Sequence, residues 1–204
     1  MTRLSLALLG GLQINLDDKP VQGFESNKVR ALLIYLAVES QRAHARSTLA
    51  ALLWPEFPDP IALRNLRFSL SNLRKILDDQ QVQPAFLLIS GPTLQLNPLG
   101  DCWLDVQAFV NAVESDQVEH LRDGVALYRG EFLEGFTVAD SSAFEEWLTL
   151  RREQYHQLVL MALDRLTVHH ERHGEYEQAQ TYARRQLELE PWREETHQVL
   201  MRIL

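Results

Sequence analysis

Cysteine is nearly absent from this 204-residue chain, and long apolar runs are absent too. The single cysteine, Cys102, excludes an internal disulfide framework and is typical of a reducing compartment. No stretch approaches the ~18 to 20 apolar residues that a membrane-spanning helix requires, and Gly10 and Gly11 interrupt the short apolar start. These absences predict a soluble cytoplasmic protein with no membrane partner.

The motifs of common enzyme classes are missing as well. The sequence has no phosphate-binding Walker loop, no Gly-x-Gly-x-x-Gly and no Gly-x-Ser-x-Gly nucleophile turn. Histidines at 169, 170 and 173 could suggest a metal site, but a His-Glu-x-x-His arrangement is lacking and such histidines are common on solvated helix faces. Paired carboxylates such as Glu145 and Glu146 stand in charged helical runs. We therefore expect no enzyme activity, no cofactor and no metal.

Basic charge is also scarce, and it is unevenly distributed. The formal net charge is −8, yet residues 1–98 hold 10 Lys and Arg against 8 Asp and Glu, a net charge of +2. Residues 99–204 hold 10 against 20, a net charge of −10. This asymmetry predicts two domains with different partners, of which the first tolerates phosphate and the second is repelled by it.

Four of the ten cations in the first half lie in one stretch, residues 62–77. Its leucines stand at 63, 66, 70, 73 and 77, so at about 100° per residue they form one apolar stripe of a helix. Arginine and asparagine match the edges of guanine and adenine, serine reaches base or phosphate, and lysine supplies a charge for phosphate. The polar face and its flanks contain Arg64, Asn65, Arg67, Phe68, Ser71, Asn72, Arg74 and Lys75. The face suits DNA recognition, although an ordinary solvated helix with Phe68 at a rim or interface is also compatible with it.

The order of elements around this stretch is typical of a winged helix. Alternating apolar residues predict strands near 4–8 and 12–16, followed by a turn at 17–20. Apolar spacing predicts helices near 28–39, 47–54 and 62–77, and a hairpin follows at 86–97 around Ser90-Gly91-Pro92. The third helix would be the recognition helix, and the hairpin tip would be the wing.

The first half carries several sequence landmarks in order: the N-terminal strands, Leu-Trp-Pro at 53–55, Leu-Arg-Asn-Leu at 63–66 and the run Ser-Leu-Ser-Asn-Leu-Arg-Lys-Ile-Leu at 69–77. With these landmarks it resembles the OmpR-type winged helix of the Streptomyces antibiotic regulatory protein (SARP) family. The resemblance implies a third helix in the major groove, a wing at the minor groove and two protomers arranged head to tail on a direct repeat. By position, it assigns DNA contacts to Arg64, Ser71, Asn72, Arg74, Lys75 and Thr93.

The loop at 55–60 has a further implied role. In OmpR-like proteins the equivalent loop contacts RNA polymerase, so the resemblance makes Glu56 and Phe57 candidate activation residues. The alternative is a rigid proline-rich connector in which Phe57 folds back onto the core.

The second half is predicted to be almost entirely helical, with a long helix at about 144–173. Its segment Tyr-Arg-Gly-Glu-Phe-Leu at 128–133, followed by Glu146-Trp147, resembles the bacterial transcriptional activator domain of the same family. Residues 160–191 have the spacing of one tetratricopeptide repeat, with Ala179 and Ala183 at the close helix contacts.

These observations predict a mostly helical α+β protein. Residues 1–98 would form a winged-helix DNA-binding domain with small antiparallel sheets, and residues 99–204 an all-α domain with tetratricopeptide-like helices. The predicted function is sequence-specific transcription regulation, as an activator that binds double-stranded promoter DNA as a homodimer and contacts RNA polymerase. The alternative is a protein-interaction module whose winged helix no longer binds DNA.

Overall fold

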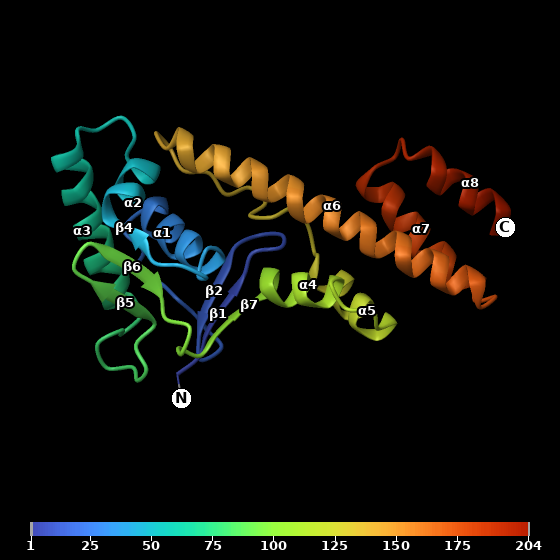
Figure 1. Ribbon diagram of the computed structural model, residues 1–204, viewed down its shortest axis with the longest axis horizontal. Helices are drawn as coiled ribbons and strands as arrows, with labels where there is room; N and C mark the ends of the chain where they lie inside the picture. The colour runs from blue at the N-terminus through green and yellow to red at the C-terminus, as the bar shows by residue number, and fades with distance from the viewer. Residues whose placement is uncertain (1, 204) are drawn as a thin grey trace.

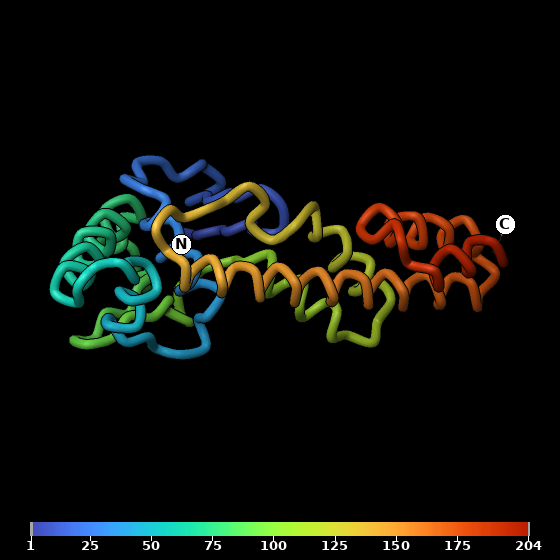
Figure 2. The backbone as a smooth tube through the Cα atoms, turned by 90° about the horizontal axis from the view of Figure 1, so that it is seen from above, coloured from blue at the N-terminus to red at the C-terminus, as the bar shows by residue number. Residues whose placement is uncertain are grey.

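The computed structural model describes residues 2–203 and shows an elongated molecule (Figures 1 and 2). One end carries two small sheets and three helices, and the other end carries two short helices packed on the far end of a long one. The mostly helical α+β fold predicted from the sequence is confirmed. None of the helices within residues 2–203 combines the length and apolar character that crossing a bilayer requires.

The first sheet combines three strands from the start of the chain with one strand that follows the wing hairpin. Its order is β3, β2, β1, β7, where β1 is Leu4–Ala7, β2 is Gln13–Leu16, β3 is Lys19–Pro20 and β7 is Cys102–Leu104. A two-residue turn links β2 and β3, and its Asp17 and Asp18 have φ values of 48° and 62°, as the right-handed twist of a hairpin favours. Strand β7 pairs with β1 in parallel, which the predicted antiparallel sheets did not include.

The second sheet contains the wing hairpin and one further short strand. Strand β4, His44–Ala45, pairs with β6, Thr93–Leu96, and β6 pairs with β5, Leu87–Ser90. The predicted hairpin is therefore present, with Gly91 at a φ of 35° in its two-residue turn. The short strand β4 was not predicted, because two residues are too few to produce a visible alternation.

The three helices of the winged helix lie close to their predicted ranges. Helix α1 is Asn27–Val38, α2 is Arg46–Leu53 and α3 is Asp59–Ile76. Pro58 and Pro60 flank the start of α3, where a fixed φ and a missing amide hydrogen cost little. Helix α1 is buried on nearly every side from Ala31 to Ala37, because α2, α3 and β6 pack around it and Trp147 of α6 lies against Tyr35.

The remaining helices form the second half. They are α4, Asp105–Val113, α5, Val118–Leu127, α6, Ser142–Arg172, α7, Tyr176–Leu189, and α8, Glu194–Ile203. Helix α6 has 31 residues, about 46 Å at 1.5 Å per residue, and it runs from α2 to the α7–α8 end (Figure 1). Ala179 and Ala183 of α7 are fully buried, as expected for the close helix contacts of a tetratricopeptide-like pair.

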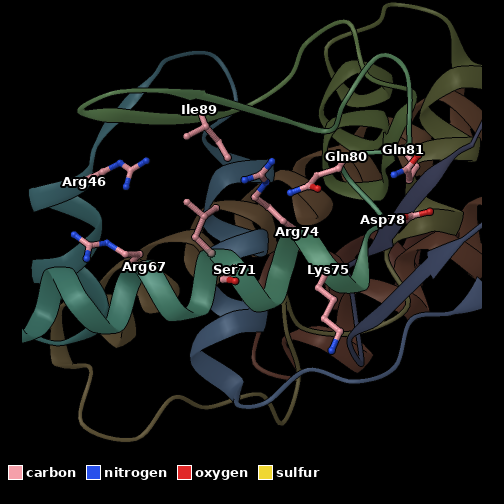
Figure 3. Close-up of a pocket in the computed structure, with 10 residues that line it drawn as sticks. Arg46, Arg67, Ser71, Arg74, Lys75, Asp78, Gln80, Gln81 and Ile89 are labelled. Atoms are coloured by element: carbon pink, nitrogen blue, oxygen red, sulfur yellow. The ribbon is translucent and has the colours of Figure 1, made fainter.

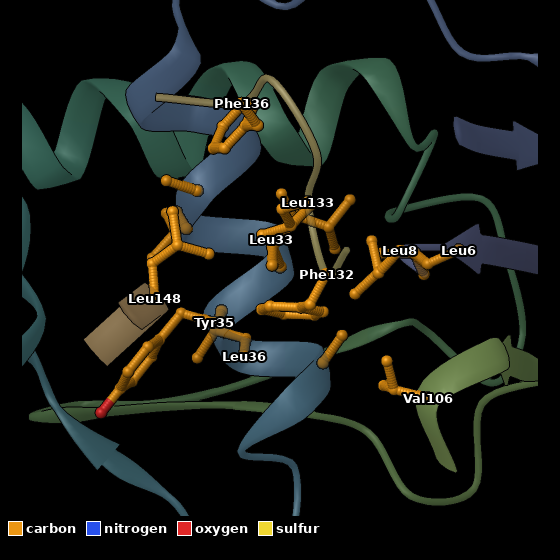
Figure 4. Packing of buried hydrophobic residues seen from close by; sticks show 14 of the residues in the cluster. Leu6, Leu8, Leu33, Tyr35, Leu36, Val106, Phe132, Leu133, Phe136 and Leu148 are labelled. Carbon is orange, nitrogen blue, oxygen red and sulfur yellow. The ribbon is translucent and has the colours of Figure 1, made fainter. Parts of the chain in front are cut away.

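One hydrophobic core joins both halves (Figure 4). Leu6 from β1, Leu8 just after β1 and Leu33 from α1 meet Phe132 from the segment that precedes α6. The ring of Phe132 lies 5.0 Å from that of Tyr155 and 6.0 Å from that of Trp147, both on α6. The predicted division at residue 98 stays a prediction, since β7 and this core connect the two sides of it.

Candidate nucleic-acid interface

Helix α3 has one buried face and one exposed face, as its leucine spacing predicts. Leu66 and Leu73 are buried against the core, whereas Arg64, Arg67, Ser71 and Lys75 are exposed. Phe68 is 63% exposed in the middle of the outward face. Asn65 is half-buried on its edge. The outward face therefore offers cations, a hydroxyl and an aromatic ring on one helix.

A groove runs between α3 and the wing (Figure 3). It has a volume of about 530 Å3, and its walls come from α2, α3, the turn after α3 and β5. Its lining side chains are Arg46, Arg67, Leu70, Ser71, Arg74, Lys75, Asp78, Gln80, Gln81 and Ile89. Four cationic residues against one carboxylate make the groove electropositive. We call it the cationic groove.

Arg46 is the cationic residue of this groove that sequence reasoning missed. It is the first residue of α2, and its backbone amide donates a hydrogen bond to the carbonyl oxygen of Pro92 at 2.8 Å, which fixes the start of α2 against the wing turn. Figure 3 shows its guanidinium on the same side of α3 as that of Arg67. No periodicity within residues 62–77 could reveal Arg46, because only the tertiary fold brings α2 beside α3.

Arg74 lies at the other end of the groove. Its Nε is 3.6 Å from Oδ2 of Asp79, whose side chain is buried and whose Oδ1 accepts a hydrogen bond from the amide of Leu87 at 3.0 Å. Asp79 therefore links the end of α3 to the first wing strand and orients Arg74 toward the wing. The predicted cation is present, but part of its charge is balanced within the protein.

Asn72 differs from the sequence interpretation. Only 8% of the residue is exposed, and its amide is bonded to the loop before α1. Its Oδ1 accepts a hydrogen bond from the amide of Glu25 at 3.2 Å, and its Nδ2 donates one to the carbonyl oxygen of Gly23 at 3.2 Å. A base contact by Asn72 would require breaking both hydrogen bonds. Its assignment to DNA stays a prediction.

The wing and the α2–α3 loop hold the other predicted residues. Thr93 is half-buried, and its hydroxyl donates to the carbonyl oxygen of Ser90 at 3.2 Å within the wing turn. Glu56 is exposed and Phe57 is 43% exposed. The alternative in which Phe57 folds back onto the core is therefore not the arrangement seen. Both loop residues are accessible to a partner.

The histidines near the end of α6 are engaged locally. Nδ1 of His170 lies 2.5 Å from Oε2 of Glu175, and Nδ1 of His173 donates to the carbonyl oxygen of His169 at 2.8 Å. Within residues 2–203, no group of three or more His, Cys, Asp or Glu is arranged to hold a metal ion. Burial raises the pKa of the Cys102 thiol to about 12, which leaves it a poor nucleophile at neutral pH.

Comparison with known proteins agrees with this architecture. Residues 107–204 match the family described as Bacterial transcriptional activator domain. The transcriptional regulatory protein EmbR of Mycobacterium tuberculosis is 32% identical over 53% of this chain and 28% of its own length. The transcriptional regulatory protein MoaR1 of the same organism is 31% identical over 79% of this chain and 52% of its own length. The chain thus spans about half or less of these curated relatives.

The fold comparison covers the whole chain. A solved structure of Mycobacterium tuberculosis EmbR in complex with a low affinity phosphopeptide superposes on all of this chain and on 55% of its own length, with a TM-score of 0.75 and 25% identity. The chain therefore combines a winged helix with a segment that matches the Bacterial transcriptional activator domain. It is similar in sequence and fold to proteins that are themselves transcriptional regulators.

Proposed function

We propose that this protein is a sequence-specific DNA-binding transcription regulator that acts as an activator and reads a direct repeat in promoter DNA through α3. Residues 1–98 form the DNA-binding domain in this proposal, and residues 99–204 form the activator domain. The observation that carries it is the exposed face of α3, which presents Arg64, Phe68, Ser71 and Lys75 beside the cationic groove. These side-chain types bind base edges, a thymine methyl group and phosphates.

The cationic groove supports a role in holding the DNA backbone. Three guanidinium groups, from Arg46, Arg67 and Arg74, line it, and that of Arg74 also faces the Asp79 carboxylate. Phosphate oxygens are the acceptors that guanidinium groups match best. We assign Arg46, Arg67, Arg74 and Lys75 to phosphate contacts, and Arg64, Phe68 and Ser71 on the outward face of α3 to base contacts.

Replacement of Arg64 by alanine tests the base-reading role. The variant is expected to lose about 1–3 kcal/mol of binding free energy on the preferred site and to relax discrimination at one base pair. Arg122→Ala is the matched control, because Arg122 is an exposed residue of α5, and it is expected to bind as wild type does. Equal affinity and specificity in the Arg64 variant and the control would remove the assignment of α3.

Replacement of Lys75 or Arg46 by alanine tests phosphate contact. Each variant is expected to weaken binding to all duplex sequences by a similar factor and to lower the slope of log affinity against log salt by roughly one. The measurement is a titration at several salt concentrations on a specific and an unrelated duplex. A salt slope equal to that of wild type would contradict the phosphate assignment for the residue concerned.

The exposed α2–α3 loop supports contact with RNA polymerase. The double variant Glu56→Ala/Phe57→Ala is expected to bind DNA with wild-type affinity and to stimulate transcription less in a purified system, because both side chains are exposed away from the groove residues. A parallel loss of DNA affinity would show instead that the loop serves DNA binding.

The competing proposal is a protein-interaction module. It is favoured by one feature of the wing, since residues 86–97 contain no lysine or arginine for a minor-groove contact. The proposals differ in the Arg64 experiment, because an interaction module has no DNA affinity for that substitution to reduce. Two protomers bound head to tail on a direct repeat are part of the DNA-binding proposal, and the mass of the protein–DNA complex tests that arrangement.

A further inference from the structure

The carboxylate of Glu39 joins the winged helix to the long helix α6. Glu39 caps the C-terminal end of α1, and its side chain is 16% exposed. Its Oε1 accepts a hydrogen bond from the indole Nε1 of Trp147 at 2.8 Å and another from Nε of Arg151 at 3.0 Å. The Nη2 group of Arg151 bonds to the same oxygen. Two side chains of α6 therefore converge on one acidic group that lies more than 100 residues earlier in the chain.

The charge of Glu39 strengthens these bonds. Burial by itself would raise the pKa of the carboxyl group, but the hydrogen bonds from Trp147 and Arg151 and the nearby positive charge outweigh burial and hold the pKa below its ordinary value. Glu39 is consequently ionised at neutral pH. Hydrogen bonds to an ionised, largely buried acceptor are stronger than bonds between neutral groups.

The same residue connects to the wing through its backbone. Nε2 of His44 lies 2.8 Å from the carbonyl oxygen of Glu39, and His44 is only 4% exposed. The His44 ring stands edge-to-face on Tyr35, with 5.2 Å between ring centroids, and Tyr35 stands likewise on Trp147 at 5.1 Å. One compact cluster thus holds α1, α6 and the first residue of β4.

Strand β4 carries the connection to the DNA-facing surface. His44 pairs with Leu94, and Ala45 pairs with Thr93, both on the wing strand β6. The next residue is Arg46, whose amide is bonded to Pro92 in the wing turn and whose side chain lines the cationic groove. His44 of the cluster and the two residues that follow it therefore fix the wing and one wall of the groove.

We infer that Glu39, Trp147 and Arg151 form a joint through which the activator domain positions the wing and Arg46 for DNA binding. Arg151 and Trp147 do not line the cationic groove and act as positioning residues. A separate contact between the two halves is the 2.7 Å hydrogen bond from the Ser141 hydroxyl to the carbonyl oxygen of Leu53, at the opposite end of α2 from Arg46. A partner that displaced α6 from Glu39 would lower DNA affinity without touching the DNA. The consequence for affinity rests on the proposed function.

The test compares Arg151→Gln and Glu39→Gln with Arg165→Gln in the full chain. Arg165 is a matched control because it also lies on α6 and donates two hydrogen bonds, to the carbonyl oxygens of Val113 and Ser115 at 2.7 and 2.8 Å, but these remain inside the second half. Amide hydrogen exchange reports on β4, β6 and Arg46 without any DNA. Titration with a DNA duplex that wild type selects from a random pool reports DNA affinity and its salt dependence.

Arg151→Gln and Glu39→Gln are expected to raise exchange at the β4 and β6 amides and at Arg46, and to lower DNA affinity by about tenfold, which corresponds to the loss of one charge-assisted hydrogen bond. The salt slope should fall toward that of Arg46→Ala, by roughly one at most, because the phosphate contact assigned to Arg46 is weakened. Arg151→Lys, which keeps the charge, should restore part of both effects. Arg165→Gln should change neither wing exchange nor affinity.

The joint would be overturned if hydrogen exchange in the wing and DNA affinity changed no more in Arg151→Gln and Glu39→Gln than in Arg165→Gln. This holds even if all variants lose thermal stability. The two levels of the proposal fail separately. If wild type binds no duplex, the proposed function fails. Faster hydrogen exchange confined to the wing in Arg151→Gln and Glu39→Gln would still support the joint in that case. Unchanged exchange would overturn it.

Discussion

Asp105→Ala is expected to lower the free energy of unfolding by about 3–5 kcal/mol, the range found when one partner of a buried charged network is removed. Asp105 begins α4 and is only 1% exposed. Its carboxylate accepts hydrogen bonds from the amides of Leu8 and Leu9 at 2.7 to 2.9 Å, and Nη2 of Arg129 lies 3.3 Å away. Alanine would leave two buried amides without acceptors, each of which costs about 1–3 kcal/mol.

Urea denaturation monitored by circular dichroism measures this loss. Asp105→Asn is expected to cost less, because one oxygen remains to accept a hydrogen bond. Gln107→Ala is a matched control on the same helix, since Gln107 is exposed and such substitutions usually stay within about 0.5 kcal/mol. A loss below about 1 kcal/mol for Asp105→Ala would show that the sheet and α4 are held together by other contacts.

Leu66→Ala and Phe68→Ala are expected to have opposite effects, although they lie two residues apart on α3. Leu66 is 1% exposed, and its truncation should cost about 2–5 kcal/mol of stability through lost burial and a residual cavity. Phe68 is 63% exposed, so its truncation should leave stability within about 0.5 kcal/mol while weakening DNA binding.

The measurement pairs urea denaturation with DNA titration at a temperature where both variants are folded. Folded Leu66→Ala should retain wild-type affinity, because its side chain faces the core. If Phe68→Ala lost stability and Leu66→Ala lost specific affinity, the outward and inward faces of α3 would be assigned the wrong way round.

Elements with strong local patterns were predictable from the sequence. The spacing of leucines placed α3 within three residues of its observed start and one residue of its end, because a buried stripe and a proline at the first turn are local signals. The small residues of α7 likewise predicted its close contact with α6, where Ala179 and Ala183 are fully buried. In both cases the physical cause lies within one helix.

Features that depend on tertiary contacts were not predictable. Asn72 has the composition of a base-reading residue, but the loop at 23–25 folds over it and takes its amide. Arg46 enters the cationic groove only because β4 pairs with the wing. Gln186 lies in a helix whose sequence is mostly polar, yet its side chain is buried. It is hydrogen-bonded to Thr167 at 3.0 Å and to Thr196 at 2.9 Å. Polar residues satisfied by distant partners carry no local signature.

The most direct test of the central claim is selection of bound sequences from a random duplex pool at about 0.1 M salt, where screening is realistic. The comparison is between wild type and Arg64→Ala/Ser71→Ala, which changes two exposed residues of α3. DNA recognition by α3 predicts that wild type enriches a direct repeat and that the variant loses this enrichment while remaining folded. A folded wild-type protein that enriches no sequence would contradict it.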